Sequence, residues 1–161
     1  MPDRQPTDRE RVEVCVPCLI LRSIVLDVRA YESDPETLRM CDEVTALLDQ
    51  DVQTVFAGQY DSSGKVRRRA QKACDQAAQA MYLEDFAAVV LAFRLLVEQL
   101  SAEGYITLVA DSNFDRAWTR FAAAVESSPE AHALDGPDVR GRASRAYKAV
   151  RRALRRRGLY R

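Results

Sequence analysis

Long segments with helical periodicity are the feature that most restricts how this chain can fold. Apolar residues recur every three or four positions along most of its length, and the six prolines and six glycines lie mostly between these segments. Pro17 is an exception, and because proline removes a backbone donor we expect a kink or a helix start near it. The sequence predicts an all-α fold, a single-domain bundle of five or six helices, because 161 residues suffice for one core.

Residues flanking the periodic segments predict where each helix begins and ends. Residue types that cap or end helices stand at Thr7, Glu10, Asp34, Gly104, Ser112 and Asp138. No proline or glycine separates residues 66–82 from residues 83–101, so these form either one long helix or two. The predicted organisation is a flexible stretch 1–6, helices 7–32, 34–57, 66–82, 83–101, 112–126 and 138–158, and a loop 127–137.

Three segments carry expectations about burial. Residues 83–101 are apolar on most sides, which is typical of the central helix of a bundle. Tyr105–Val109 has a strand-like composition but no partner strand, so we interpret it as a buried linker or an early helical turn. Three aromatic side chains at helical spacing are expected in the core, with a stacking surface for bases as the alternative: Phe114, Trp118 and Phe121.

Basic residues concentrate at the C-terminal end of the chain. Of the 24 Arg and Lys residues, ten lie in residues 139–161, which contain no Asp or Glu. Residues 1–138 hold the other 14 basic side chains and all 24 acidic ones, a net charge of −10 facing one of +10. The neutral total therefore conceals a polyanion-binding element attached to an acidic body.

The final helix is predicted to have one apolar side and a broad cationic side. At 100° per residue, its apolar side chains form one stripe: Val139, Ala143, Ala146, Tyr147, Val150, Ala153 and Leu154. Seven cations cover most of the remaining circumference: Arg142, Arg145, Lys148, Arg151, Arg152, Arg155 and Arg156. Cations at one-turn spacing can engage several phosphates together, and arginine favours bidentate contacts, so these seven are predicted to contact a nucleic-acid backbone.

A second basic group begins the third predicted helix and consists of Lys65, Arg67, Arg68, Arg69 and Lys72. Cations at a helix N-terminus oppose the helix dipole, which favours an external anion there. We expect this group to extend the same basic surface if the bundle brings the two helix ends together. The alternative is an ordinary charged helix start in water.

Three interpretations of the final helix stay open: contact with nucleic acid, docking of an acidic protein partner, or a solvated surface that includes pairing with the chain's own carboxylates. From residue 139 onward the helix has no mixed-sign pairs, and like charges four residues apart repel each other. A helix of this kind is destabilised alone, which favours nucleic acid.

The residue patterns do not assemble a catalytic or metal site. Residues 58–66 resemble a phosphate-binding loop, but Gln59 and Val66 replace the glycine and the Ser or Thr that the loop needs. Cys15 and Cys18 have metal-ligand spacing without a second ligand pair, so we expect buried core cysteines.

The remaining polar candidates are equally isolated. His132 is the only histidine, so a nucleophile–histidine–carboxylate triad cannot be assembled around it. Four carboxylates of the second predicted helix are expected on its solvent face: Asp42, Glu43, Asp49 and Asp51. We therefore expect no enzymatic activity and neither a metal nor a cofactor.

The sequence predicts a cytoplasmic protein without a membrane segment. Its longest apolar run, Phe86–Phe93, has eight residues, whereas crossing a bilayer takes roughly 20. The N-terminal region is interrupted by charged residues and Pro17, unlike a secretory signal. Four cysteines are too few for a disulfide scaffold of this length, which favours a reducing compartment.

In size, helical layout, acidic body and arginine-rich final helix, the chain resembles the small helical subunit of class 1, multi-subunit CRISPR effector complexes. An alanine- and arginine-rich chain suits the type IV branch of these antiviral defence systems. The resemblance covers the whole chain in outline and rests on no diagnostic motif, so no family residues are carried over. It implies a non-catalytic ribonucleoprotein subunit, copies of which stack together and contact the guide–target RNA–DNA duplex or the displaced single strand.

Two other classes of function are compatible with the sequence. In the first, the chain is a helical adaptor whose basic helix docks an acidic protein partner through apolar anchors such as Tyr147 or Leu159. In the second, it is a DNA-binding transcriptional regulator. The fifth predicted helix offers only Arg116 and Arg120 as base-reading cations, which makes it a poor recognition helix.

Overall fold

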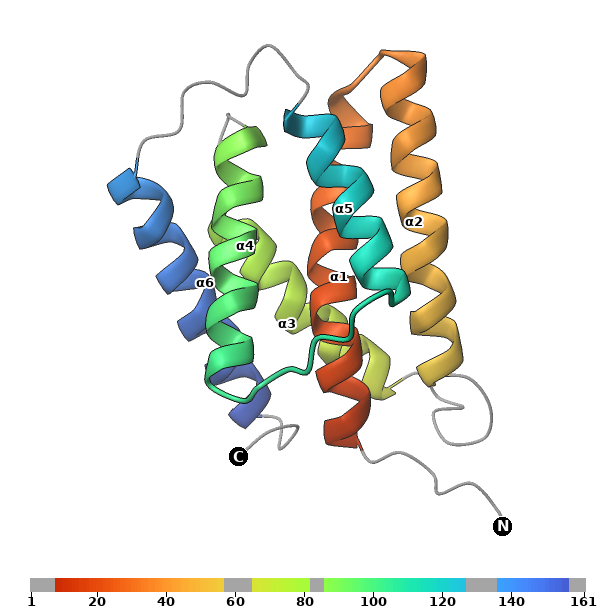
Figure 1. Ribbon diagram of the computed structural model, residues 1–161. Helices are drawn as coiled ribbons and strands as arrows, with labels where there is room; N and C mark the ends of the chain where they lie inside the picture. Colours follow the sequence, from red (N-terminus) through yellow and green to blue (C-terminus); the bar gives the residue numbers. More distant parts are fainter. Residues whose placement is uncertain (1–7, 57–64, 82–85, 127–135, 157–161) are drawn as a thin grey trace.

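A computed structural model describes residues 8–56, 65–81, 86–126 and 136–156, which contain six α-helices and no strand (Figure 1). The predicted all-α bundle is confirmed. The helices are α1 (Asp8–Tyr31), α2 (Pro35–Phe56), α3 (Lys65–Met81), α4 (Phe86–Ala102), α5 (Asn113–Glu126) and α6 (Gly136–Arg156).

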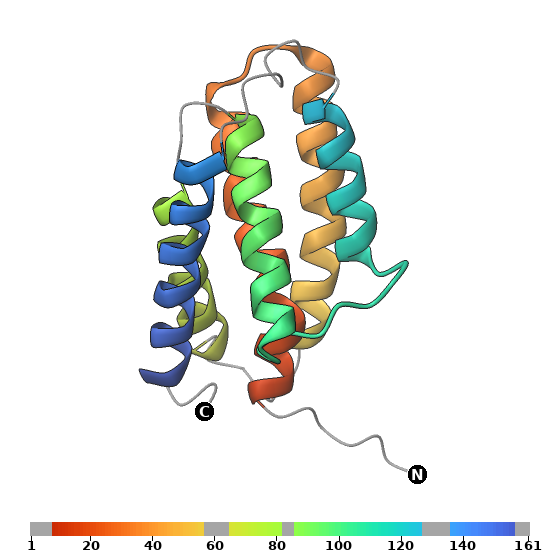
Figure 2. The same cartoon turned by 60° about the vertical axis from the view of Figure 1, so that its left-hand side comes forward.

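The helices form three layers of two, α3 with α6, α1 with α4, and α2 with α5 (Figure 2). Neighbouring helices pack in a closed ring that runs from α1 to α2, α5, α4, α6 and α3 and back to α1. Each helix therefore packs against two neighbours in the ring.

The most enclosed helix is α1, not α4 as predicted. Residues 16–21 of α1 are buried in succession, which on a helix means contact around the whole circumference. On α4, Phe93 and Leu96 are buried, but Arg94 and Glu98 are exposed and form an outer face. Helix α1 also continues through the buried Pro17, so the alternative of a helix start near that residue is wrong.

The predicted caps of α2, α4 and α5 are present. Asp34 Oδ2 accepts from the Thr37 backbone N–H at 3.1 Å at the start of α2. Gly104, at a φ of 76°, ends α4, and the Tyr105 N–H closes the turn onto the Leu100 carbonyl at 2.8 Å. Ser112 Oγ caps α5 by accepting from the Asp115 N–H at 3.2 Å.

Other predicted boundaries differ from the structure or fall outside it. Residues 66–101 form two helices, α3 and α4, which run in opposite directions (Figure 1). Helix α6 begins at Gly136, so Asp138 lies inside its first turn and is not the cap; Pro137 suits that turn because its missing N–H would have no helical partner. Thr7, of the predicted capping box, lies outside the described residues.

The segment after α4 is only partly buried. Tyr105 and Ile106 are in the core, as expected of a buried linker, and the segment continues without helical turns. Leu108 and Val109 are 45% and 62% exposed, so this half of the prediction is wrong. The segment runs across the face of the bundle from the end of α4 to the start of α5 (Figure 1).

Candidate nucleic-acid interface

The formal charges of the helices are sorted by layer. Helices α3 and α6 carry 13 basic and two acidic residues, an excess of 11 positive charges. The middle layer, α1 with α4, has five of each sign and is neutral, and α2 with α5 has three basic and seven acidic residues, an excess of four negative charges. The molecule is therefore polarised from one outer layer to the other.

Within the basic layer, the two arginine-rich helix ends lie toward the same end of the bundle. Helices α3 and α6 pack against each other and run in opposite directions, so the start of α3 is near the end of α6 (Figures 1 and 2). A continuous basic surface was expected only if the bundle brought these two helix ends together. The structure therefore places the two predicted groups of cations in one layer.

Helix α6 docks through the predicted apolar stripe. Its buried side chains are Val139, Ala143, Ala146, Tyr147 and Val150. Tyr147 packs edge-on against Tyr105, with the ring centroids 6.1 Å apart, which ties α6 to the segment that follows α4. The side chains of Ala153 and Leu154 lie outside the described part of the structure.

The predicted cations of α6 divide into two groups by exposure. Arg145, Lys148 and Arg152 are exposed, and none of them pairs with a carboxylate among the described residues. Arg142 and Arg151 are half-buried and engaged: Arg142 has an interaction partner, and the Cζ of Arg151 lies 5.6 Å from the centre of the Tyr147 ring. The helix includes Arg155 and Arg156, whose side chains lie outside the described part.

On α3, the described members of the predicted group are Arg68 and Lys72. Both are exposed, one helical turn apart, and neither forms an ion pair within the described ranges. The side chains of Lys65, Arg67 and Arg69 lie outside those ranges, although their backbone begins α3.

The acidic layer differs in that its carboxylates are used inside the fold. The four carboxylates expected on the solvent face of α2 each accept from another helix. Asp49 and Asp42 accept from Arg22 and Arg29 of α1, both at 2.8 Å; Glu43 accepts from Arg120 at 3.4 Å and Asp51 from Asn113 at 2.8 Å, both of α5. These side chains link α2 to its neighbours α1 and α5, whereas the exposed cations Arg145, Lys148 and Arg152 of α6 form no ion pair among the described residues.

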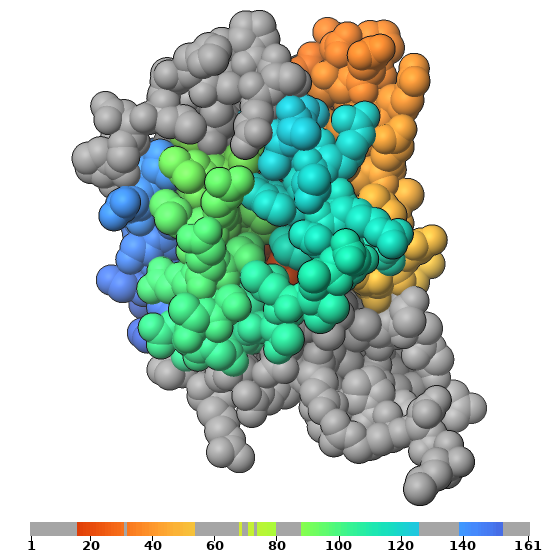
Figure 3. All heavy atoms as spheres, in the orientation of Figure 1, coloured from red at the N-terminus to blue at the C-terminus, as the bar shows by residue number. Residues whose placement is uncertain are grey.

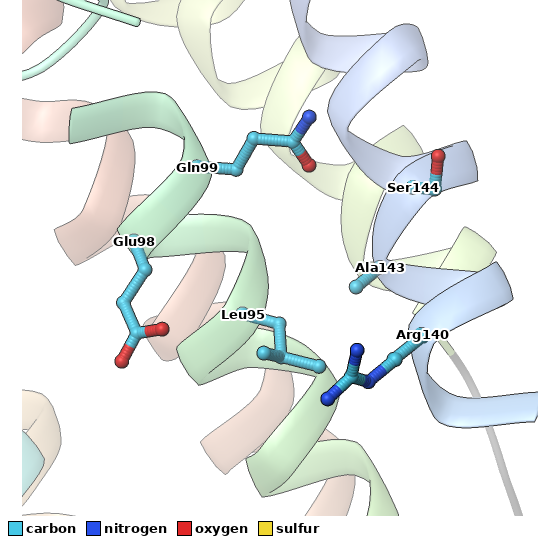
Figure 4. A pocket seen from close by; sticks show the side chains of 6 residues that line it. All are labelled: Leu95, Glu98, Gln99, Arg140, Ala143 and Ser144. Carbon is cyan, nitrogen blue, oxygen red and sulfur yellow. The ribbon is translucent and has the colours of Figure 1, made fainter. Parts of the chain in front are cut away.

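A groove of about 440 Å³ separates α4 from the first half of α6 (Figure 4). It is lined by Leu95, Glu98, Gln99, Arg140, Ala143 and Ser144. Arg140 extends from α6 toward α4, Gln99 extends from α4 toward α6, and Glu98 points away from α6 (Figure 4). Arg140, Gln99 and Ser144 were not among the site residues predicted from the sequence. Their only sequence signal is the four-residue spacing of Arg140, Ser144 and Lys148 along one flank of α6.

A second hollow, of about 320 Å³, lies between α4, α5 and the segment that joins them, on the face shown in Figure 3. Phe93 forms its aromatic floor with Trp118 and Phe114, at ring-centroid distances of 5.1 and 6.3 Å. Phe121 is buried in the core as predicted, but Phe114 and Trp118 are half-buried at the edge of this hollow. The Cζ of Arg94 lies 5.9 Å from the centre of the Trp118 ring.

The cysteines and the other candidates do not form a reactive site in the described residues. Cys18, Cys41 and Cys74 are buried free thiols, and Cys74 Sγ donates to the Val16 carbonyl at 3.7 Å. Within those residues, no three His, Cys, Asp or Glu side chains are placed to hold a metal ion. Cys15 has no described side chain, and His132 and residues 57–64 lie outside the described ranges.

None of the described helices combines the length and the apolar character needed to span a membrane. Comparison of the chain with protein families, curated proteins and solved structures finds no match.

Proposed function

We propose that this protein is a non-catalytic subunit that binds the backbone of nucleic acid through the outer face of its α3–α6 layer, without regard to sequence. In this role it belongs to a cytoplasmic multi-subunit ribonucleoprotein and resembles the small subunit of a CRISPR effector complex. The partners are an RNA–DNA duplex or a displaced single strand, other protein subunits, and further copies of the chain.

One observation carries the proposal: the basic ends of α3 and α6 share one layer, with an excess of 11 positive charges on the two helices. Exposed Arg145, Lys148 and Arg152 project from the same helix at spacings of three and four residues, about 4.5 and 6 Å along its axis. This is the scale of the phosphate repeat along a strand, so several phosphates can be engaged at once.

Phosphate binding also accounts for the asymmetry between the two outer layers. The carboxylates of α2 are matched by cations from α1 and α5, but the exposed cations of α6 have no such match among the described side chains. Packing two positively charged helices side by side costs free energy through repulsion, and a bound polyanion offsets that cost.

The test is a charge reversal with a matched control on the opposite layer. Arg145→Glu/Arg152→Glu and Arg39→Glu/Arg116→Glu change the net charge equally, and all four side chains are exposed. Binding to labelled single strands and RNA–DNA duplexes is measured by fluorescence anisotropy at several salt concentrations. We expect the α6 variant to lose affinity for every sequence alike and its salt slope to fall by about 1.4–1.8, since each of two lost phosphate contacts contributes about 0.7–0.9.

The α2–α5 control should bind like the wild-type protein. Equal affinity of the α6 variant and the wild type at low salt would reject the backbone contact.

The main alternative is an adaptor whose basic helix docks an acidic protein, and exposed Leu108 and Val109 beside the aromatic hollow favour some protein contact. The adaptor is distinguished by a complex that survives nuclease and that nucleic-acid competitor does not dissociate.

A further inference from the structure

The α4–α6 groove has the composition of a pocket for a planar polar group. Leu95 and Ala143 form an apolar floor, and the side chains of Gln99, Arg140 and Ser144 surround it (Figure 4). Among the described residues these three polar side chains form no hydrogen bond with one another or with other groups, so they remain available to a ligand. The groove, of about 440 Å³, is open to solvent along its outer side.

The groove adjoins the exposed cations of α6. Ser144 lines the groove, and the exposed Lys148 follows it by four residues, about 6 Å along the same flank of the helix. A phosphate held by Lys148 therefore has its own base within reach of the groove. The groove and the exposed cations of α6 can thus bind the same nucleic-acid strand.

The polar groups are those that recognise the edge of a base. Arg140 presents only donors, in a fork that matches the O6 and N7 acceptors of guanine, and the Gln99 amide can both donate and accept. Arg140 supplies the positive charge on the side of the groove nearest α6, and the carboxylate of Glu98, which also lines the groove, points away from α6 (Figure 4). A phosphate alone would use the Gln99 amide only as a donor and would leave the apolar floor formed by Leu95 and Ala143 uncovered.

We infer that the groove between α4 and α6 receives one unpaired purine base, guanine in preference, from a single strand whose phosphates lie along α6. This inference rests on the proposed function. It adds that the relevant nucleic acid is single-stranded at this point, because a paired base would first have to leave its stack, at a cost in free energy. It also adds a preference for one base to an otherwise sequence-independent contact.

The test uses the full chain and two labelled oligoribonucleotides, an all-uridine strand and the same strand with one central guanine. We expect the wild type to bind the guanine-containing strand at least about fivefold more tightly, the low end of what a bidentate base contact supplies. Gln99→Leu and Arg140→Lys should abolish this preference while leaving the affinity for the all-uridine strand within about twofold. The second variant keeps the charge and removes only the fork.

Matched controls are Gln76→Leu on α3 and Arg116→Lys on α5, both at exposed positions, and both should keep the preference. The circular dichroism spectrum and the melting temperature of every variant confirm folding. In addition, a strand carrying 6-thioguanine should photo-crosslink to peptides that contain residues 95–99 or 140–144.

The outcomes separate the two proposals. Failure of the wild type to bind either strand at low salt overturns the proposed function itself. Binding of both strands with equal affinity overturns the base pocket alone, as does a guanine preference that persists in both groove variants. A thioguanine crosslink confined to other helices would also overturn the base pocket.

Discussion

Arg22 Nε donates to Asp49 Oδ1 at 2.8 Å, joining α1 to α2 where both side chains are about 70% shielded from water. About two turns further along α1, Arg29 forms a pair of the same length with Asp42, but 50% and 62% of these two side chains are exposed. The two pairs differ in burial and not in distance, so they separate the contribution of shielding from that of geometry.

Replacing Arg22 should therefore cost much more stability than replacing Arg29. Arg22→Met keeps the apolar stem but leaves Asp49 without its cation in a partly buried site, which should lower the free energy of unfolding by about 2 kcal/mol. Arg29→Met should lower it by less than about 0.5 kcal/mol, because water and salt screen the exposed pair. Urea unfolding followed by circular dichroism measures both, and equal losses would contradict the role of burial.

Buried thiols provide a second prediction. Cys18, Cys41 and Cys74 have no exposed surface, and burial, with a smaller effect from Asp42, raises the pKa of the Cys41 thiol. Because the thiolate is the reactive form, a Cys15→Ser variant should react with a disulfide reagent at pH 8 only as fast as it unfolds. In urea, where the protein is unfolded, all three thiols should become accessible to the reagent. A thiol that reacts rapidly in the native protein would show that one of these helices opens locally.

Local sequence was sufficient to predict that these segments are helical and which side of α6 packs against the bundle. The period of the apolar positions and the caps at Asp34 and Ser112 depend on neighbouring residues only, and both appear in the structure. The stripe that begins at Val139 is buried for the same reason, because one face of an amphipathic helix has to leave water.

Relations between helices could not be predicted in the same way. The burial of residues 16–21 around the whole circumference of α1 depends on α2 and α3 packing on both of its sides, which no local pattern encodes. The groove likewise exists only because α4 and α6 are neighbours, so Gln99 and Arg140, 41 positions apart in sequence, carried no joint signal. The conditional prediction about α3 and α6 needed the same information about topology.

Asp27 provides a prediction about pH. Its pKa is raised above the ordinary value of 3.8, first by burial and then by the negative charge of Asp75 on α3, a carboxylate that also accepts from Ser23 Oγ at 2.7 Å. A raised pKa means that the folded state binds the proton more tightly than the unfolded state. Ionised Asp27 therefore lowers stability, and this loss develops as pH rises from the ordinary pKa through the raised one.

Asp27→Asn should accordingly raise the free energy of unfolding at pH 7 by a few tenths of a kcal/mol, a small gain because Asp27 is largely in water. At a pH of about 3 and below, where Asp27 is protonated in both states, the two proteins should be equally stable. Urea unfolding at both pH values checks this. A difference that is the same at both pH values would point to lost packing and not to ionisation.

Repulsion within the basic layer yields the prediction most closely tied to function. Arg68 and Lys72 are exposed like charges at i, i+4, an arrangement that destabilises a helix by about 0.2–0.5 kcal/mol, and α6 adds further cations beside α3. Arg68→Gln/Lys72→Gln should therefore be more stable than the wild type in low salt, by about 0.5 kcal/mol or more. High salt should remove the difference, because the repulsion is between solvent-exposed charges.

The same repulsion predicts that a polyanion stabilises the wild type more than the variant. Added single-stranded oligonucleotide should raise the melting temperature of the wild type, since a ligand that binds only the folded state stabilises it. The double variant should show a smaller rise, whereas Gln76→Leu, at an exposed position on the same helix, should behave like the wild type. If oligonucleotide shifted the wild type and the double variant equally, α3 would not belong to the binding surface, and the contact would be confined to α6.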